Sequence, residues 1–184
     1  MPTPSANEIV AFWRAAGPAK WFAKDAALDA EIIRRFEAAH HAAARGEMAG
    51  WGDTADGALA LLILLDQFPR NIWRGSAHAF ATDPLARSLA LAAIAAGHDL
   101  ACDAAMRVFF YLPLEHSEAL ADQDLCLAKC ADLDAASGSE WSKWAALHRD
   151  IIVRFGRFPH RNACLGRAST AEELAFLEQG GFAG

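Results

Sequence analysis

Two segments of the chain carry the same unusual run of residues. DQFPRN occupies 66–71 and GRFPHRN occupies 156–162, so Phe-Pro followed by Arg-Asn occurs twice, the second time with His160 inserted. Arginine presents a planar fork of N–H donors that suits a carboxylate or a phosphate. The repetition predicts either a diverged repeat or two halves of one site, in which Asn71 and Asn162 lie within roughly 12 Å of each other on packed helices.

Basic residues gather around the second segment, although the chain as a whole has a formal net charge of −6. The stretch 154–167 contains four arginines and one histidine but no acidic residue. This distribution predicts a pocket for an anionic group, formed by arginine, histidine and asparagine side chains. The candidate ligand-binding residues are Asp66, Arg70, Asn71, Glu115, His116, Arg157, His160, Arg161 and Asn162.

A structural role for the same arginines is the alternative interpretation. They could pair with the chain's own Asp66, Glu115 and Glu118, and so hold helix ends together as buried ion pairs. The two interpretations are compatible if some arginines pair internally while one or two face a cleft.

The segment EHSE at 115–118 offers the residue types of acid–base catalysis. A carboxylate beside an imidazole can tune the histidine pKa toward neutrality and make a general base. His116, Glu118 and His160 are therefore the catalytic candidates, for a small hydrolase or lyase acting on an anionic substrate. The same residues are also ordinary at a helix start, where Ser117 would act as the cap.

The sequence predicts neither a metal nor a cofactor. Cys126 and Cys130 share a helix face, and we interpret them as small apolar side chains that pack in the core. Glu37 and His40 have the Glu-x-x-His spacing of di-iron bundles, but the chain has no second such pair. Walker A and G-x-G-x-x-G strings are also missing.

The residue pattern around these segments predicts about eight helices and no sheet, because alanine and leucine dominate while glycine and proline fall at segment edges. The third helix is apolar nearly all round, so we expect it to be the central buried one, with Pro69 as its end. Ser5, Thr82, Ser117 and Thr170 are the predicted caps for four of the others. The expected helices run from Ser5 to Gly17 and over about 25–45, 55–67, 82–97, 101–111, 117–136, 141–155 and 170–180.

Helices of this length with short connections pack as antiparallel hairpins. We expect a single domain over 1–184, arranged as a right-handed stack of hairpins like that of tetratricopeptide repeats, although the 34-residue repeat signature is not visible. An irregular helical bundle is the alternative architecture.

Three strings resemble the hallmarks of a bacterial family, domain of unknown function 924. They are LLDQFPRN at 64–71, PLEHSE at 113–118 and RFGRFPHRN at 154–162, and the similarity extends from about Phe12 to Leu177. Arg14 departs from the pattern, where an aromatic or apolar residue is expected. The resemblance implies an all-α, tetratricopeptide-like fold and carries no assigned activity.

Composition narrows the possible partners. The acidic balance argues against nucleic acid, and the longest apolar run is too short to span a bilayer, so we expect a cytoplasmic protein. The leading hypothesis is a binding module for a peptide carboxylate, a phosphate or a small acid. A purely structural oligomer, such as a dimer, is the third alternative beside the binding module and the enzyme.

Overall fold

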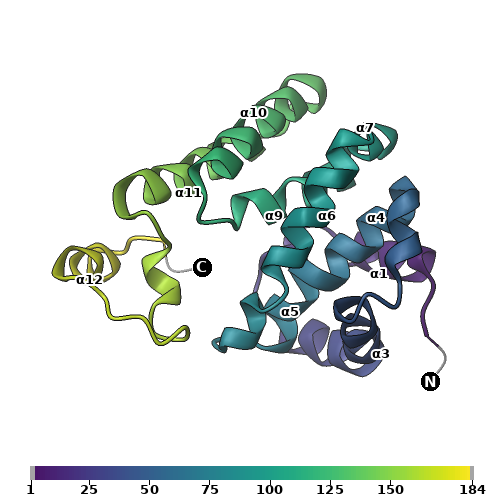
Figure 1. The fold of residues 1–184 in the computed structure, drawn as a ribbon, viewed down its shortest axis with the longest axis horizontal. Coiled ribbons are helices and arrows are strands. Elements are labelled where there is room, and N and C mark those ends of the chain that lie inside the picture. Colours follow the sequence, from purple (N-terminus) through teal and green to yellow (C-terminus); the bar gives the residue numbers. More distant parts are fainter. Residues whose placement is uncertain (1–2, 183–184) are drawn as a thin grey trace. The chain divides into compact units, whose positions relative to one another are not determined.

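The computed structural model describes residues 3–182, and every regular element within them is helical (Figure 1). Helices make up 74% of the structure, and no strand occurs in the described part, which confirms the all-α prediction. Contacts divide the chain into two compact units, an N-terminal unit (residues up to 74 with 78–113) and a C-terminal unit (75–77 with 114 onward). The expected single domain stays a prediction.

The N-terminal unit is built from short and medium helices around a buried centre. Its elements are α1 (Ala6–Ala16), α2 (Pro18–Trp21), α3 (Ala26–Ala44), η1 (Ala49–Asp53), α4 (Ala55–Leu62), the π-helix η2 (Ile63–Gln67), α5 (Phe68–Ile72), α6 (Asp83–Ala95), α7 (His98–Ala101), α8 (Ala104–Arg107) and η4 (Val108–Phe110). Two short helices, η3 (Ala77–Phe80) and α9 (Leu112–Glu115), lie at the boundaries of the units.

Side-chain caps occur at several of the predicted helix starts. Ser5 forms a reciprocal capping box with Glu8 at the start of α1. Asp25 accepts two backbone N–H groups at the start of α3, and Thr54 accepts one at the start of α4. Side-chain oxygens at these positions satisfy donors that a helix start leaves without an intrahelical partner.

The central position of α4 is also confirmed. Every residue over 57–69 is buried, and α4 packs against both α1 and α6. Phe68 stacks on Phe36 of α3 at 5.0 Å between ring centroids and meets Trp13 of α1 edge-on at 5.6 Å. Ile33 of α3 is 40% exposed because it lies to one side of the buried stripe through Phe36.

The expectation that Pro69 ends the third helix is wrong. The chain widens into the π-helix η2, in which the N–H of Phe68 donates to the carbonyl of Ile63, and then continues as α5. Pro69 lies in the first turn of α5, where a residue needs no N–H donor. The helical path therefore continues to Ile72 and positions Arg70 and Asn71.

Three other boundaries differ from the prediction. The helix expected over 101–111 is broken into α8 and η4 after α7, because Asp103 starts a new helix by accepting from Ala105 and Met106. Thr82 does not cap α6, since its hydroxyl donates instead to the carbonyl of Leu65. Ser117 does not cap the following helix, because its hydroxyl donates to Asp122 at 2.5 Å and α10 starts later, after Ala119.

The C-terminal unit contains α10 (Leu120–Ser137), α11 (Trp141–Phe155), η5 (Pro159–Arg161) and α12 (Ala171–Glu178). α10 and α11 pack along their length as a hairpin (Figure 1), which agrees with the expected helix pairing. α11 buries Ala145, His148, Ile151 and Ile152 on one face, whereas Trp144 is 53% exposed. A tetratricopeptide-like stack of hairpins stays a prediction.

Candidate functional site

The first predicted segment, 66–71, holds its arginine against carboxylates of the N-terminal unit. The Arg70 fork donates to both oxygens of Asp83, each at 3.0 Å, and to the carbonyl of Asp66 at 2.6 Å. The Asp66 carboxylate, 1% exposed, lies 3.3 Å from the same guanidinium. Arg70 therefore links the start of α6 to the end of η2 through hydrogen bonds and ion pairs within the chain, an arrangement that we call an internal tie.

Asn71 takes part in a second tie within the same unit. Its amide donates to Asp29 of α3 at 2.7 Å, and Arg74 donates to both oxygens of that carboxylate at 2.9 and 3.0 Å. Burial raises the pKa of Asp29, but the hydrogen bonds from Arg74 and Asn71 outweigh it and leave the pKa below its usual value. Both polar residues after Pro69 thus fasten α5 to its neighbours.

The second predicted segment, 156–162, begins where Gly156 ends α11 in the left-handed conformation, φ 69°. Phe158 is fully buried, and η5 follows it. The Arg161 guanidinium lies 4.5 Å from the centroid of the Phe158 ring and donates to the carbonyl of His116 at 3.0 Å. Arg161 is only 6% exposed, so the turn after α11 directs it inward.

Arg157 donates hydrogen bonds to both carboxylate oxygens of Glu173 on α12, at 2.6 and 2.8 Å. Glu173 is 2% exposed. Asn162 donates to the same carboxylate at 3.2 Å, and the N–H of Thr170 donates at 2.7 Å as part of the predicted capping box. The hydrogen bonds from Arg157 and Thr170 lower the pKa of Glu173 to about 2. Glu173, which the sequence analysis did not select, is the acidic centre of this region.

Glu118 has a different role from the predicted acid–base one. It accepts a fork from Arg167 at 2.7 and 3.0 Å and the backbone N–H of Phe158 at 2.8 Å. Burial raises the pKa of Glu118, but the hydrogen bonds from Arg167 and Phe158 lower it by more. Such a carboxylate stays ionised at neutral pH and fixes the turn after α11.

The histidines of the predicted site have separate environments. His148 is 7% exposed, with its Nδ1 atom 2.9 Å from the carbonyl of Trp144 and 3.3 Å from the Glu115 carboxylate. Burial and the charge of Arg161 lower the pKa of His160 to about 3. A histidine with so low a pKa is neutral at pH 7 and a weak general base, which disfavours His160 in that role.

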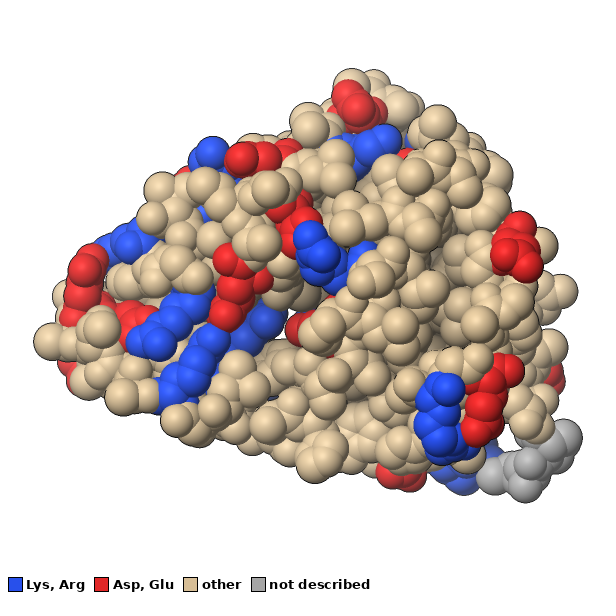
Figure 2. All heavy atoms as spheres, in the orientation of Figure 1, with Lys and Arg blue, Asp and Glu red and all other residues tan. Residues whose placement is uncertain are grey.

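The structure thus supports the structural interpretation for Arg70 and Arg157, each of which holds both oxygens of an internal carboxylate. Figure 2 shows acidic and basic side chains interleaved over the region of η5 and α12. The two repeated segments lie in different units, so the predicted closeness of Asn71 and Asn162 stays a prediction.

Two hollows adjoin on the C-terminal unit, and the sequence analysis missed most of their residues. Both include Arg154 and Phe155. The first has a volume of about 390 Å³ and is mainly apolar, and the second, of about 400 Å³, is more polar. Leu147, Asp150, Ile151, Phe176, Gly180, Gly181 and Phe182 complete the apolar hollow, and Arg157, Thr170, Glu172 and Glu173 complete the polar one. The basic stretch signalled Arg154 and the string at 154–162 contains Phe155, but no motif marked Phe176 or Phe182.

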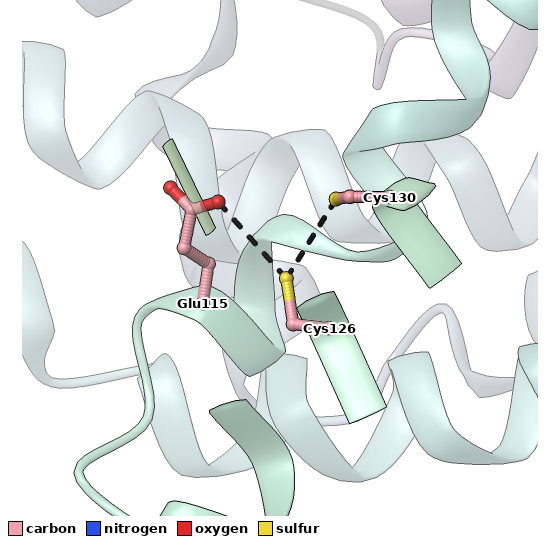
Figure 3. Close-up of side chains that lie close together, drawn as sticks. All are labelled: Glu115, Cys126 and Cys130. Carbon is pink, nitrogen blue, oxygen red and sulfur yellow. Dashed lines mark hydrogen bonds between the residues drawn. The ribbon is translucent and has the colours of Figure 1, made fainter. Parts of the chain in front are cut away.

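A buried group of metal-binding residue types lies elsewhere in this unit. The thiols of Cys126 and Cys130 on α10 are 3.9 Å apart, and Glu115 at the end of α9 has an oxygen 4.0 Å from the thiol of Cys126 (Figure 3). The hydrogen bond with Cys130 and burial raise the pKa of Cys126. The sequence analysis found the two cysteines but not the carboxylate beside them.

The fold and these sites define an all-helical protein with two compact units and internal arginine–carboxylate ties. Residues 9–181 match the sequence model of a protein family, DUF924. That family is described as a bacterial protein of unknown function. The chain therefore belongs to the DUF924 family, which confirms the resemblance noted from its strings.

A solved structure of a protein of unknown function from Agrobacterium tumefaciens is 53% identical to this chain. The similarity covers 95% of this chain and 97% of that one, with a TM-score of 0.88. No curated protein matches the chain. Over residues 3–182, no helix combines the length and the apolar character needed to cross a membrane.

Proposed function

We propose that this chain is a helical binding module for an anionic group, and that the group binds in the C-terminal unit beside Arg154. The observation that carries the proposal is the pair of adjoining hollows that share Arg154 and Phe155, one apolar and the other polar. The sequence predicts an Arg/His/Asn pocket, and Arg157 of that predicted set lines the polar hollow.

The ion pair of Arg154 is more exposed to solvent than that of Arg157. Its carboxylate partner is Glu172 at 2.9 Å, and the two side chains are 52% and 62% exposed. Such surface pairs contribute roughly 0–1 kcal/mol, so an incoming carboxylate can replace Glu172 at little cost. Arg157 is unsuitable for exchange, because its partner Glu173 is buried.

The apolar hollow supports a ligand with a hydrophobic body. Its volume of about 390 Å³ falls within the usual range for small-ligand sites, roughly 300–1,000 Å³. The Arg154 guanidinium lies 4.7 Å from the ring centroid of Phe155 and 5.6 Å from that of Phe176, which orients it at the edge of the hollow. We infer that the ligand is a peptide C-terminus, with an apolar last side chain in the hollow and its carboxylate on Arg154.

The test compares two tripeptides by isothermal titration calorimetry, acetyl-Ala-Leu-Phe with a free carboxylate and the same peptide as its amide. We expect saturable binding of the acid and at least about tenfold weaker binding of the amide, because a hydrogen bond to a charged group contributes about 1.5–3 kcal/mol. Arg154→Gln should weaken the acid by a similar factor. Glu172→Gln should strengthen it about two- to fivefold, because the competing carboxylate is removed.

Lys143→Gln is the matched control. Lys143 is another cation on α11, 73% exposed, and it lies outside both hollows. Its removal changes the net charge by the same amount as Arg154→Gln and should leave the affinity for the acid unchanged. Equal binding of acid and amide, or equal losses in the two variants, would rule out recognition by Arg154.

A further inference from the structure

Three metal-binding side chains converge inside the C-terminal unit, away from both hollows. They are Glu115, Cys126 and Cys130, and one ligand atom from each lies within 4.8 Å of the other two. The cysteines are fully buried and Glu115 is 5% exposed. Figure 3 shows the Glu115 carboxylate extending from α9 toward the two thiols on α10.

The helix geometry explains why the two thiols meet. Cys126 and Cys130 are four residues apart on α10, so they lie one above the other on a single helix face. The same spacing places two histidines on one face of a helix in zinc metalloproteases. Glu115 comes from the preceding helix and supplies a third donor that no local spacing reveals.

The separation of the two thiols fits a tetrahedral zinc ion. Two thiolates at about 2.3 Å from zinc are separated by about 3.8 Å when the angle is tetrahedral. The sulfur atoms here are 3.9 Å apart, and the Glu115 oxygen is 4.0 Å from the sulfur of Cys126. We propose that Glu115, Cys126 and Cys130 bind one Zn²⁺ ion, with a water molecule completing four-coordination.

The chemistry of the donors selects the class of metal. Thiolates favour zinc and other soft or borderline ions, whereas Mg²⁺ and Ca²⁺ require oxygen donors, of which this group has one carboxylate. His148 lies 3.3 Å from the Glu115 oxygen that does not face Cys126, so it holds the carboxylate in orientation. Ligating carboxylates commonly have such an outer partner. The proposal reverses the sequence-based expectation of no metal, which rested on reading the cysteines as core packing and on the lack of a second Glu-x-x-His pair.

The test uses the full chain, first purified without chelators for zinc analysis and then titrated with Co²⁺ as a spectroscopic substitute. We expect one equivalent of zinc per chain, and one equivalent of cobalt that gives a thiolate-to-cobalt charge-transfer band and tetrahedral d–d absorption. Glu115→Gln should weaken metal binding at least about 100-fold, because even outer-sphere changes cost 10–100-fold. Cys126→Ala and Cys130→Ala should abolish the charge-transfer band, with circular dichroism used to confirm that each variant is folded.

Two control variants separate this site from others. Cys164→Ser removes a half-buried thiol of the same unit, and Arg154→Gln alters only the proposed peptide site, so both should bind cobalt like the parent. The proposal is overturned if the folded parent gives no charge-transfer band, or if folded Cys126→Ala or Glu115→Gln binds cobalt with parental affinity. A Cys126–Cys130 disulfide in freshly purified, alkylated protein would also overturn it.

Discussion

The two Phe-Pro segments share their residues but not their backbone. In 66–71 the chain passes from η2 into α5, so Phe68 and Pro69 lie within one helical path. In 156–162, Gly156 ends α11 first, Phe158 is extended, and Pro159 begins η5. The difference arises before Phe-Pro, because Gln67 continues a helix while a glycine in the left-handed conformation stops one.

The arginines after the two prolines consequently have different partners. Arg70 lies one residue after Pro69 in a helix and reaches two carboxylates, whereas Arg161 lies after the inserted His160 and packs on Phe158. Arg70 pairs with carboxylates of its own unit, and Arg161 stacks on the Phe158 ring and donates to a backbone carbonyl. A short polar string therefore does not define a common site, since its geometry depends on the preceding turn.

The largest effect should come from Arg70. Replacement by alanine leaves the buried Asp66 carboxylate without its cation, so Arg70→Ala should lower the free energy of unfolding by about 3–5 kcal/mol. Arg74 is a more exposed arginine, with 36% of its side chain accessible. Arg74→Ala should therefore cost no more than about 1 kcal/mol. Urea unfolding of both variants measures the contrast. Equal losses would show that Arg70 is held no more tightly than a surface residue.

An intermediate, pH-dependent effect is expected at Glu173. Its folded pKa is about 2, below the ordinary value of 4.5, so the stability that it contributes is present above pH 4.5 and is lost as pH falls toward 2. Arg157→Gln removes the largest cause of this shift. The stability gap between parent and variant, measured by urea unfolding, should therefore be widest at neutral pH and narrow between about pH 5 and pH 2. A constant gap would disprove the ion pair.

The smallest of the three effects should come from Arg161. Arg161→Ala removes the hydrogen bond to the His116 carbonyl and the cation–π contact with Phe158; these two contacts contribute about 2 kcal/mol, which corresponds to a fall in melting temperature of about 4–8 °C. Arg161→Lys, which keeps the charge but not the planar stack, should recover part of the loss. An unchanged melting temperature in Arg161→Ala would favour the original hypothesis of a ligand-facing arginine.

Local rules predicted the helices whose ends depend on neighbouring residues. Capping boxes at Ser5 and Thr170 and the glycine stop at Gly156 lie where the sequence predicted them, because these interactions span only a few residues. Ser117 and Thr82 were wrong as caps, since each hydroxyl has a competing partner that the local sequence does not show.

The candidate sites depended on contacts between distant parts of the chain. The sequence marked the arginines of both segments as candidate ligand-binding residues, with internal ion pairs as the alternative, but it did not identify the carboxylates of Asp83 and Glu173, which lie 13 and 16 residues from Arg70 and Arg157. The two cysteines were visible as one helix face, and Glu115, 11 residues before Cys126, was not recognised as their neighbour.

The sequence by itself determined the helical class, the buried centre at α4 and the family, because periodicity, caps and long strings are properties of local order. Only the tertiary structure decided which arginine pairs with a buried carboxylate, as Arg157 does with Glu173, and which pairs with an exposed one, as Arg154 does with Glu172. It also brought Glu115 to the thiols of α10. Burial and the meeting of separate helices are set by packing of the whole chain, which no short segment encodes.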